Sequence, residues 1–526
     1  MKQIRTLGLG LLLGGAALMA QALTPDEARS IALGETDARI EALGRAVVHG
    51  DERTAAFLQA LADDAVKVAG ERVFIVRDGQ GRDPVSGAAV AVPESAEDVI
   101  SNNRLRSEID TALAALKLFS RDATQRREAA RALLKEPDAA RLPLLDQALA
   151  AETDPALRAE IGFARAAARL ASEDRTQRLD AAKQLADSRT PDTQRLLHQR
   201  LAEETDTGVR VQLQAALDRI DTALAWGEKL GALFTGVSLG SILLLVALGL
   251  AITYGLMGVI NMAHGELMMI GAYATYVVQT LFRQHLPGAF DAYLLAALPA
   301  AFLSAALVGA LLERSVLRHL YGRPLETLLA TWGISLVLMQ AVRSLFGAQN
   351  VGVENPSWMS GGLPVLANLT LPYNRLVIIA FAAAVLLGMA LLIGRTRLGL
   401  FVRAVTQNRP MASCTGVNTA RIDTYAFALG SGIAGLAGCA LSQIGNVGPD
   451  LGQSYIVDSF MVVVLGGVGQ LAGTVYAALG LGILNKLLEG WTGAVLAKIA
   501  VLVLIIVFIQ KRPQGLFAVK GRSAEA

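Results

Sequence analysis

Residues 253–276, TYGLMGVINMAHGELMMIGAYATY, constrain the fold of this chain more than any other stretch. The segment is apolar enough to lie at membrane depth, yet Asn261, His264 and Glu266 interrupt it within six positions and four glycines recur through it. A bilayer interior tolerates polar side chains and broken backbone only where they are buried in protein or line a wet cavity. The stretch therefore predicts an element that lines a path across a membrane rather than a simple anchor.

The distribution of charge divides the chain into two unlike parts. Residues 23–230 carry 36 acids and 29 bases, a net charge of −7, whereas residues 231–526 carry 10 acids and 17 bases, a net charge of +7. The total of +2 hides this division. We expect a soluble domain (residues 23–225), a membrane domain (226–517) and a cytoplasmic tail (518–526).

Residues 1–22 read as a secretory signal peptide. Lys2 and Arg5 form the positive start, Leu7–Met19 the apolar core, and AQA at 20–22 a small-residue cleavage site. The apolar run is short for a membrane span, which needs about 20 residues. An uncleaved first helix is the alternative, and both interpretations place the residues that follow outside the cytoplasm.

The exported part has the Ala-, Leu-, Arg- and acid-rich composition of helices with a solvated face. Val66–Val92 interrupts it: β-branched residues alternate on either side of a Gly/Asp/Pro turn, which predicts a short β-hairpin. Helix is expected to resume near Asn102.

An internal repeat with an offset of 52 residues occupies the rest of this part. LAAETDPALR at 149–158 matches LAEETDTGVR at 201–210, and Arg126 matches Arg178. Asp154 and Asp206 suit the N-caps of helices. The copies resemble HEAT-like helical repeats, whose stacked helices bury a shared core. A docking surface and a packed cap without a partner both remain compatible with the pattern.

Apolar segments predict that the second part is an all-α polytopic membrane protein with about eight or nine transmembrane or partial helices. Twelve Lys and Arg residues lie in the connections assigned to the inside and only Arg283 in those outside, which predicts a cytoplasmic C-terminus. The runs 267–282 and 456–465 are short, so tilted, partial or broken helices are expected there. The segments are 231–252, 267–282, 292–312, 325–346, 375–394, 425–443, 456–465, 471–489 and 495–510.

Two Gly-interrupted segments near either end of the membrane domain resemble each other. GVINMAHGELMM at 258–269 has a weak echo in GVGQLAGTVYAA at 467–478. In transporters, paired broken segments of this kind point to the central binding site.

The inward connection 395–424 is the longest and most basic, and 402–412 is expected to form a short helix whose end Pro410 leaves uncertain. A handle for a cytoplasmic partner and ordinary positive-inside anchoring are the two interpretations. The sequence contains no Walker-type phosphate loop, no serine–histidine elbow, no paired catalytic carboxylates and no metal cluster. We expect a non-enzymatic chain without cofactor or metal, whose energy comes from a partner or an ion gradient.

Three stretches resemble permeases of the branched-chain amino acid type of ABC importer: 249–276, the pattern at 403–417, and LGGVGQLAGTVYAALGLGIL at 465–484. The resemblance covers about 290 residues, essentially the whole membrane domain. Within that family, 313–350, NPSWMSGG at 355–362 and LPYNR at 371–375 look like the urea permeases, a subgroup that also carries an exported domain.

The resemblance implies an inner-membrane subunit of a bacterial urea ABC importer that works by alternating access. It would lie in the lipid bilayer and pair with a second permease, two cytoplasmic ATP-binding subunits and a periplasmic solute-binding protein. No nucleic acid is expected as a partner. The inward loop would supply the segment that seats on an ATPase. Its matching residues are Arg403, Ala404, Asn408, Met411, Ala412, Ser413 and Gly416.

Urea is small, neutral and planar, so a site for it needs several acceptors and one donor in a narrow slot. Polar or flat side chains at membrane depth can supply them. The candidates for the substrate pathway are Asn261, His264, Glu266, Tyr254, Thr331, Trp332, Ser335, Gln340, Asp458 and Gln470. Structural roles compete at three of these: a backbone contact for His264, a helix-dipole contact for Glu266 and a helix cap for Asp458.

Other functions remain open alongside urea import. A permease for branched-chain amino acids or short amides is the nearest alternative, although a zwitterion needs charge partners. A stand-alone channel, or a helical-repeat sensor with a membrane anchor, belongs to a different class.

Overall fold

The computed structural model describes residues 23–48, 52–77, 80–93, 95–120, 122–258, 261–467, 469–513 and 515–517. The chain divides into two compact units between Ala225 and Trp226. The predicted signal peptide and cytoplasmic tail lie outside the described residues.

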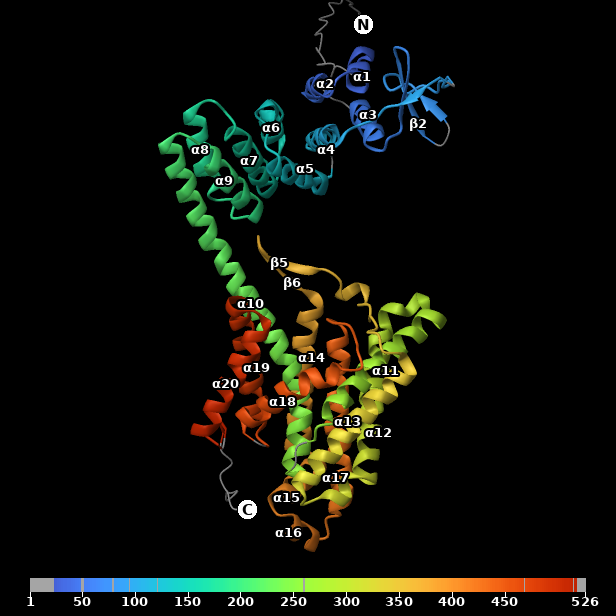
Figure 1. Ribbon diagram of the computed structural model, residues 1–526, viewed down its shortest axis with the longest axis vertical. Coiled ribbons are helices and arrows are strands. Elements are labelled where there is room, and N and C mark those ends of the chain that lie inside the picture. The colour runs from blue at the N-terminus through green and yellow to red at the C-terminus, as the bar shows by residue number, and fades with distance from the viewer. Residues whose placement is uncertain are drawn as a thin grey trace, which may run out of the picture. The chain divides into compact units, whose positions relative to one another are not determined.

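Helices with one small sheet build the first unit (Figure 1). The sheet is antiparallel, in the order β3-β2-β1-β4. The predicted hairpin is present as β1 (Val66–Ala69) and β2 (Arg72–Arg77), and two strands that were not predicted, β3 (Gln80–Arg82) and β4 (Glu97–Asp98), extend it. The helices are α1 (Pro25–Ala32), α2 (Thr36–Val48), α3 (Glu52–Ala62), α4 (Asn103–Lys117), α5 (Ala123–Lys135), η1 (Ala139–Arg141), α6 (Leu142–Ala151), α7 (Pro155–Arg169), α8 (Arg175–Leu185), α9 (Pro191–Glu203) and the start of α10 (Thr207–Met257).

Helix starts in this unit follow the sequence signals. The side chain of Asn102 accepts a hydrogen bond from the backbone N–H of Leu105 and caps α4. Asp154 caps α7 in the same way through Ala156, and Asp206 accepts from Val209 at the start of α10. Apolar faces of these helices meet in one continuous core.

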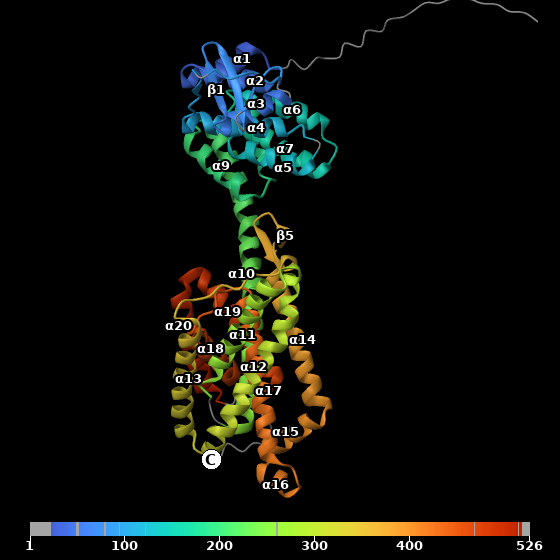
Figure 2. The same cartoon turned by 90° about the vertical axis from the view of Figure 1, so that its right-hand side faces the viewer.

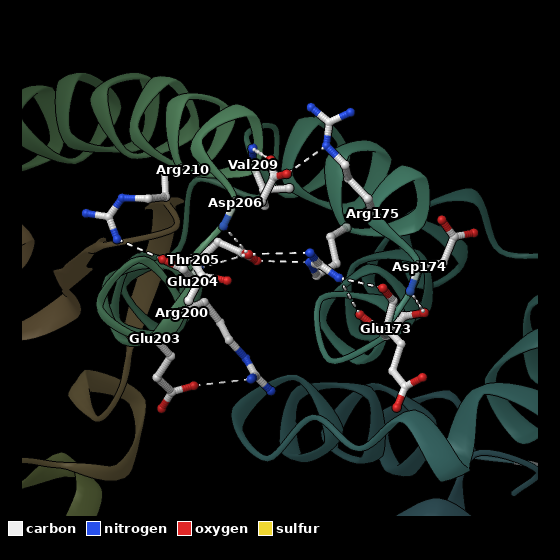
Figure 3. A network of polar contacts seen from close by, with 12 residues as sticks. Glu173, Asp174, Arg175, Arg200, Glu203, Glu204, Thr205, Asp206, Val209 and Arg210 are labelled. Atoms are coloured by element: carbon white, nitrogen blue, oxygen red, sulfur yellow. Dashed lines mark hydrogen bonds and ion pairs between the residues drawn. The ribbon is translucent and has the colours of Figure 1, made fainter.

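The 52-residue repeat is visible in matching side-chain contacts. In the first copy Nε of Arg126 donates to Oε2 of Glu152 at 2.8 Å, and Nη1 donates to the carbonyl six residues before the arginine at 2.9 Å. In the second copy Arg178 makes the same two contacts, with Glu204 at 2.9 Å and with the carbonyl six residues back at 3.0 Å (Figure 3). Each arginine thus joins the first helix of its copy to the turn that precedes the third helix of that copy.

The two glutamates also order that turn. Oε1 of Glu152 accepts from the backbone N–H groups of the next two residues at 2.9 and 3.0 Å, and Glu204 does the same at 3.1 and 3.0 Å. Both acids are therefore fully engaged as charged acceptors.

Acid should destabilise the first unit through Glu152. The hydrogen bond from Arg126, followed by the one from the backbone of Asp154, holds the pKa of Glu152 below its usual value. A carboxyl with a depressed folded-state pKa contributes stability above its unfolded pKa, about 4.3, and that stability is lost as pH falls through the folded value. We expect Glu152→Gln to lower the free energy of unfolding by about 1–3 kcal/mol at pH 7. The further loss of stability as the pH falls should be smaller in this variant than in wild type.

Hydrogen exchange of α5–α7 amides in the full-length protein, at pH 7 and in acid, measures this effect. Glu41→Gln is the control, because the Glu41–Arg45 pair is exposed on α2 and exposed pairs contribute little. Equal protection of α5–α7 in wild type and Glu152→Gln at pH 7 would refute the assignment.

The second unit is a bundle of helices with one small hairpin. Seven described helices are long and apolar enough to cross a membrane, at Thr207–Gly255, Pro287–Ser315, Pro324–Phe346, Tyr373–Arg395, Thr419–Ser442, Leu471–Thr492 and Ala494–Lys511. With the shorter apolar helix α18 this confirms the predicted class of all-α polytopic membrane protein. The elements after α10 are α11 (His264–His285), η2 (Pro287–Ala292), α12 (Tyr293–Ser315), η3 (Leu317–Leu320), α13 (Pro324–Phe346), η4 (Ser357–Met359), β5 (Gly362–Leu366), β6 (Leu369–Pro372), α14 (Tyr373–Arg395), α15 (Arg397–Gln407), α16 (Arg409–Cys414), α17 (Thr419–Ser442), α18 (Leu451–Gly466), α19 (Leu471–Thr492) and α20 (Ala494–Lys511).

Helices α11, α12 and α17 form the centre of this bundle (Figure 2). Glycines let their backbones touch: a Cβ on Gly271 of α11 would lie 2.2 Å from the carbonyl oxygen of Gly435 in α17, and one on Gly438 would lie 1.9 Å from that of Met268. Small residues of this kind allow the close van der Waals packing that holds membrane helices together.

Two local predictions need correction, and one element was not predicted. A tilted, partial or broken helix was expected at 267–282; the partial helix is wrong, because α11 has 22 residues and starts in the polar stretch before that run. The expected helix at 402–412 is two helices, since Asn408 ends α15 and caps α16, where Pro410 fits the first turn. The hairpin β5–β6 was not predicted.

Candidate functional site

A break between α10 and α11 places polar groups inside the membrane unit. Gly258 ends the α10 region with a φ of +67°, a conformation that other residues rarely adopt. Asn261 follows, and its Oδ1 accepts from the backbone N–H of Ala263 at 3.1 Å. The side chain of Asn261 is 3% exposed, and its amide nitrogen has no partner within the described part of the chain.

Helix α13 lies against this break. Thr331 Oγ1 accepts from the backbone N–H of Met262 at 3.2 Å, and one turn later Ser335 Oγ donates to Oε1 of Glu266 at 2.8 Å. Thr331, Ser335 and Glu266 are all buried. Four of the candidate residues are therefore gathered between the start of α11 and one face of α13.

Glu266 and Asn261 each keep an unused polar atom in this group. Oε2 of Glu266 and Nδ2 of Asn261 are buried and meet no hydrogen-bond partner among the described residues. The described ion pairs do not include Glu266 either, although Lys and Arg pairs are recorded elsewhere in the unit. An unsatisfied buried group costs about 1–3 kcal/mol, and such groups also occur elsewhere in the unit, at Ser238, Ser431 and Ser459 for example. The pairing of an unused acceptor with an unused donor makes this group a candidate binding position.

Further along α11, an aromatic pair lies on the same face of the helix as Glu266. Tyr273 lies two turns after Glu266, and its ring centroid is 4.7 Å from that of Phe346 at the end of α13. The Tyr273 hydroxyl is buried without a partner in the described structure. Gln279, which sequence reasoning did not single out, also leaves its amide nitrogen unpaired, and a lone amide inside an apolar run was the available signal.

His264 has a structural contact instead of a place in this group. One ring nitrogen, Nε2, lies 3.2 Å from the carbonyl oxygen of Val246 in α10, and the ring is fully buried. Gly249 leaves room for it, since a Cβ there would lie 3.1 Å from the ring. The contact fixes the start of α11 against α10. It agrees with the interpretation of His264 as a residue that packs against a backbone carbonyl.

Three further candidates lie outside the polar group. Trp332 is 53% exposed and Gln340 is exposed as well, because neither shares the buried face of α13 that Thr331 and Ser335 form. Tyr254 is half-buried and packs against the core of α10, α18 and α19. Trp332 and Gln340 therefore lie apart from the Asn261–Glu266 group, and their place in the substrate pathway stays a prediction.

Asp458 pairs with a base instead of capping its helix. Its Oδ2 lies 3.6 Å from Nζ of Lys498, which joins α18 to α20. An acid and a base that pair inside apolar helices offset part of each other's desolvation. Asp458 therefore has a structural partner.

The second break lies beside the first. Gly467 and Gly469 have φ values of +95° and +78° between α18 and α19, and Gln470 stands at the N-cap of α19 without a side-chain cap bond. A Cβ on Gly255, near the end of α10, would lie 3.7 Å from the Cα of Gly469. The two broken elements that resemble each other in sequence thus meet in space.

The candidate coupling segment is α15 and α16, at the end of the unit opposite β5 and β6 (Figure 2). Its outer face is exposed, and Met411 is 61% accessible. Ala412 is buried and Ala404 half-buried, so they pack toward the bundle. The exposed members are Arg403, Asn408, Met411, Ser413 and Gly416.

A cavity of about 390 Å³ lies elsewhere, between the start of α12, η4, α14 and α17. Its lining is apolar, with Leu294, Leu298 and Phe381 among the residues. It shares no residue with the Asn261–Glu266 group. The polar group and this cavity are therefore separate features of the membrane unit.

Comparisons with known proteins agree with these features. The family described as "Branched-chain amino acid transport system / permease component" matches residues 232–510. The high-affinity branched-chain amino acid transport system permease protein LivH of Escherichia coli (strain K12) is 30% identical over 294 residues, which cover 54% of this chain and 94% of that protein. BraD of Pseudomonas aeruginosa, a permease of the same description, is 29% identical over 290 residues, covering 54% and 94%. A probable LivH of Methanocaldococcus jannaschii is 26% identical over 310 residues, covering 56% and 93%. No solved structure matches the chain.

Proposed function

The chain belongs to the family of branched-chain amino acid transport system permease components, and on that premise we propose that its membrane unit forms half of the translocation pathway of an ATP-driven ABC importer. The observation that carries the proposal is the buried group of Asn261, Glu266 and Ser335 at a helix break, in which one donor and one acceptor have no partner among the residues that the structure describes. A solute loses hydrogen bonds to water when it enters the membrane, and hydrogen bonds to those two atoms replace them.

The importer works by alternating access. Helix α13 separates from the start of α11 on one side at a time, so that Glu266 and Asn261 meet the solute from outside and then release it inside. Two cytoplasmic ATP-binding subunits supply the energy, because the sequence lacks a Walker-type phosphate loop. A second permease completes the pathway, and a periplasmic solute-binding protein delivers the cargo. The chain lies in a bacterial inner membrane, with the first unit in the periplasm and the C-terminus in the cytoplasm.

We propose a branched-chain amino acid as the first candidate cargo, because the relatives are named for that transport. Its ammonium pairs with Oε2 of Glu266 and its carboxylate accepts from Nδ2 of Asn261. A buried carboxylate such as Glu266, without a basic neighbour, requires a charge partner. In this assignment the ammonium of the solute is that partner.

Urea is the second candidate, supported by the resemblance of 313–350, 355–362 and 371–375 to urea permeases. It is also supported by the absence of a basic side chain paired with Glu266 in the described structure, since a substrate carboxylate gains no cation there. Urea offers N–H donors to Glu266 and a carbonyl to Asn261. The first unit falls outside the match to the amino acid permease family, which begins at residue 232.

Uptake into vesicles that contain the assembled transporter tests both proposals. We expect uptake of radiolabelled leucine to require ATP and the solute-binding protein. Urea uptake without leucine uptake under those conditions would favour the second candidate. Uptake of either solute without ATP would refute the importer and favour a channel.

A further inference from the structure

A chain of buried polar contacts ties α16 to the helix bundle. Arg409, the first residue of α16, donates from Nη2 to Oδ2 of Asp423 in α17. The guanidinium carbon also lies 4.8 Å from the centre of the Tyr321 ring, a cation–π arrangement. Asp423 is 2% exposed, and Arg409 is its ion-pair partner among the described residues.

The contacts continue from Tyr321 into α12. The Tyr321 hydroxyl donates to Oε1 of Glu313 at 3.3 Å. Oε2 of Glu313 accepts from Thr424 at 2.6 Å and lies 3.7 Å from a guanidinium nitrogen of Arg318. Glu313 is fully buried, so α12, the η3 region and α17 share one network that ends at α16.

Removing Arg409 leaves the buried carboxylate of Asp423 without its partner, and a buried charge without compensation costs several times more than the loss of an exposed pair. Apolar anchoring of α16 is slight by comparison, since Ala412 is its only buried residue among those described. Arg409 therefore makes the strongest connection between this six-residue helix and the bundle.

The bundle members that receive this connection are in close backbone contact with one another. Backbone contacts at Gly271, Gly435 and Gly438 join α11 to α17, and Gly435 also meets the carbonyl of Ala301 in α12. Helix α13 has no such contact at its glycine, since a Cβ on Gly333 would meet no atom within 4 Å, and it joins α11 through hydrogen bonds of Thr331 and Ser335. We therefore expect a displacement of α17 and α12 to shift Glu266 on α11 relative to Ser335 on α13.

We propose that Arg409 is the positioning residue that converts movement of α16 into opening of the site at Glu266. The inference rests on the proposed function, in which the α15–α16 segment seats on an ATP-binding subunit. A pull on α16 passes through Asp423 to α17 and through Tyr321 and Glu313 to α12, and the α11–α12–α17 group follows.

The test uses the assembled transporter in vesicles, with ATP hydrolysis and leucine and urea uptake measured on the same preparation. We expect Arg409→Met to reduce uptake about tenfold or more, in the range of typical coupling energies, while the ATP-binding subunits stay bound and hydrolysis stays within about twofold of wild type. Arg409→Lys, which keeps the positive charge beside Asp423, should retain more uptake per ATP than Arg409→Met. Arg323→Met is the control, because Arg323 forms an exposed pair with Glu326 on α13.

Three results would overturn the inference: unchanged uptake in Arg409→Met, a parallel fall of uptake and hydrolysis with the subunits still bound, or equal loss in Arg409→Lys and Arg409→Met. If Arg409→Met does not assemble, Asp423→Asn, which removes the buried charge from the other side of the same pair, takes its place, and an unchanged ratio of uptake to ATP hydrolysis in Asp423→Asn then counts against the inference. Failure of wild type to couple ATP to uptake of either solute refutes the proposed function instead, so the two outcomes are distinct.

Discussion

Glu266→Gln is expected to lower leucine uptake by about ten- to a hundredfold, which corresponds to the 1.5–3 kcal/mol of a hydrogen bond to a charged group. The carboxylate is buried, has Ser335 as its hydrogen-bond partner at 2.8 Å and leaves Oε2 free for a solute. Glutamine keeps the size of the side chain but cannot pair with an ammonium. Initial rates of ATP-driven uptake in vesicles, at equal amounts of assembled transporter, measure the change.

The same substitution separates the two candidate cargoes. An amide oxygen still accepts an N–H of urea, so urea uptake should fall by less than leucine uptake. Glu326→Gln is the matched control, because that acid lies exposed on α13 and pairs with Arg323. Leucine uptake in Glu266→Gln equal to that of wild type would show that the solute does not meet this carboxylate.

Much of the bundle was predictable because a bilayer leaves few choices. Helices satisfy their own backbone hydrogen bonds, so long apolar runs such as 375–394 and 495–510 could only become helices, and α14 and α20 confirm both. Short runs were harder to predict. Polar residues at the start of α11 made its length ambiguous, because contacts with α10 and α13 are what allow His264 and Glu266 to lie inside a helix.

Sequence reasoning found residues that are neighbours in space where a polar side chain was flanked by apolar ones without a local structural role, and their part in binding stays a prediction. Asn261, Glu266, Thr331 and Ser335 are such residues, and they come together. Trp332 shows the limit, since one residue along a helix turns the side chain by about 100° and only the neighbouring helix decides which face is inside.

The network at Arg409 lay beyond sequence reasoning for another reason. Thr424 and Glu313 are 111 residues apart, yet their side chains are 2.6 Å apart. No local pattern links them. Acids near the ends of apolar segments, Glu313 and Asp423, were the only signal, and each alone fits an ordinary surface role.

Met411→Asp is expected to release the ATP-binding subunits. Met411 is 61% exposed on α16 while its neighbour Ala412 is buried, so the methionine points away from the bundle and suits an anchor in a partner's pocket. Burying a carboxylate in place of an apolar anchor removes a contact worth about 2 kcal/mol or more, a loss of roughly thirtyfold or more in affinity. Co-purification of the ATP-binding subunits with the permease measures it directly.

The predictions for Met411 and Arg409 differ, because the two residues are expected to have different roles in α16. Met411→Leu keeps an apolar side chain and should keep the subunits, and Leu363→Asp on β5 repeats the chemical change at an exposed residue on the opposite end of the unit. Met411→Asp should lose the subunits and therefore ATP hydrolysis, whereas Arg409→Met should keep both and lose uptake. Two residues of a single turn of one short helix would then separate attachment of the ATPase from transmission of its movement. Retention of the subunits by Met411→Asp would place the docking surface elsewhere on the inward connections, and α16 would lose its role as the handle.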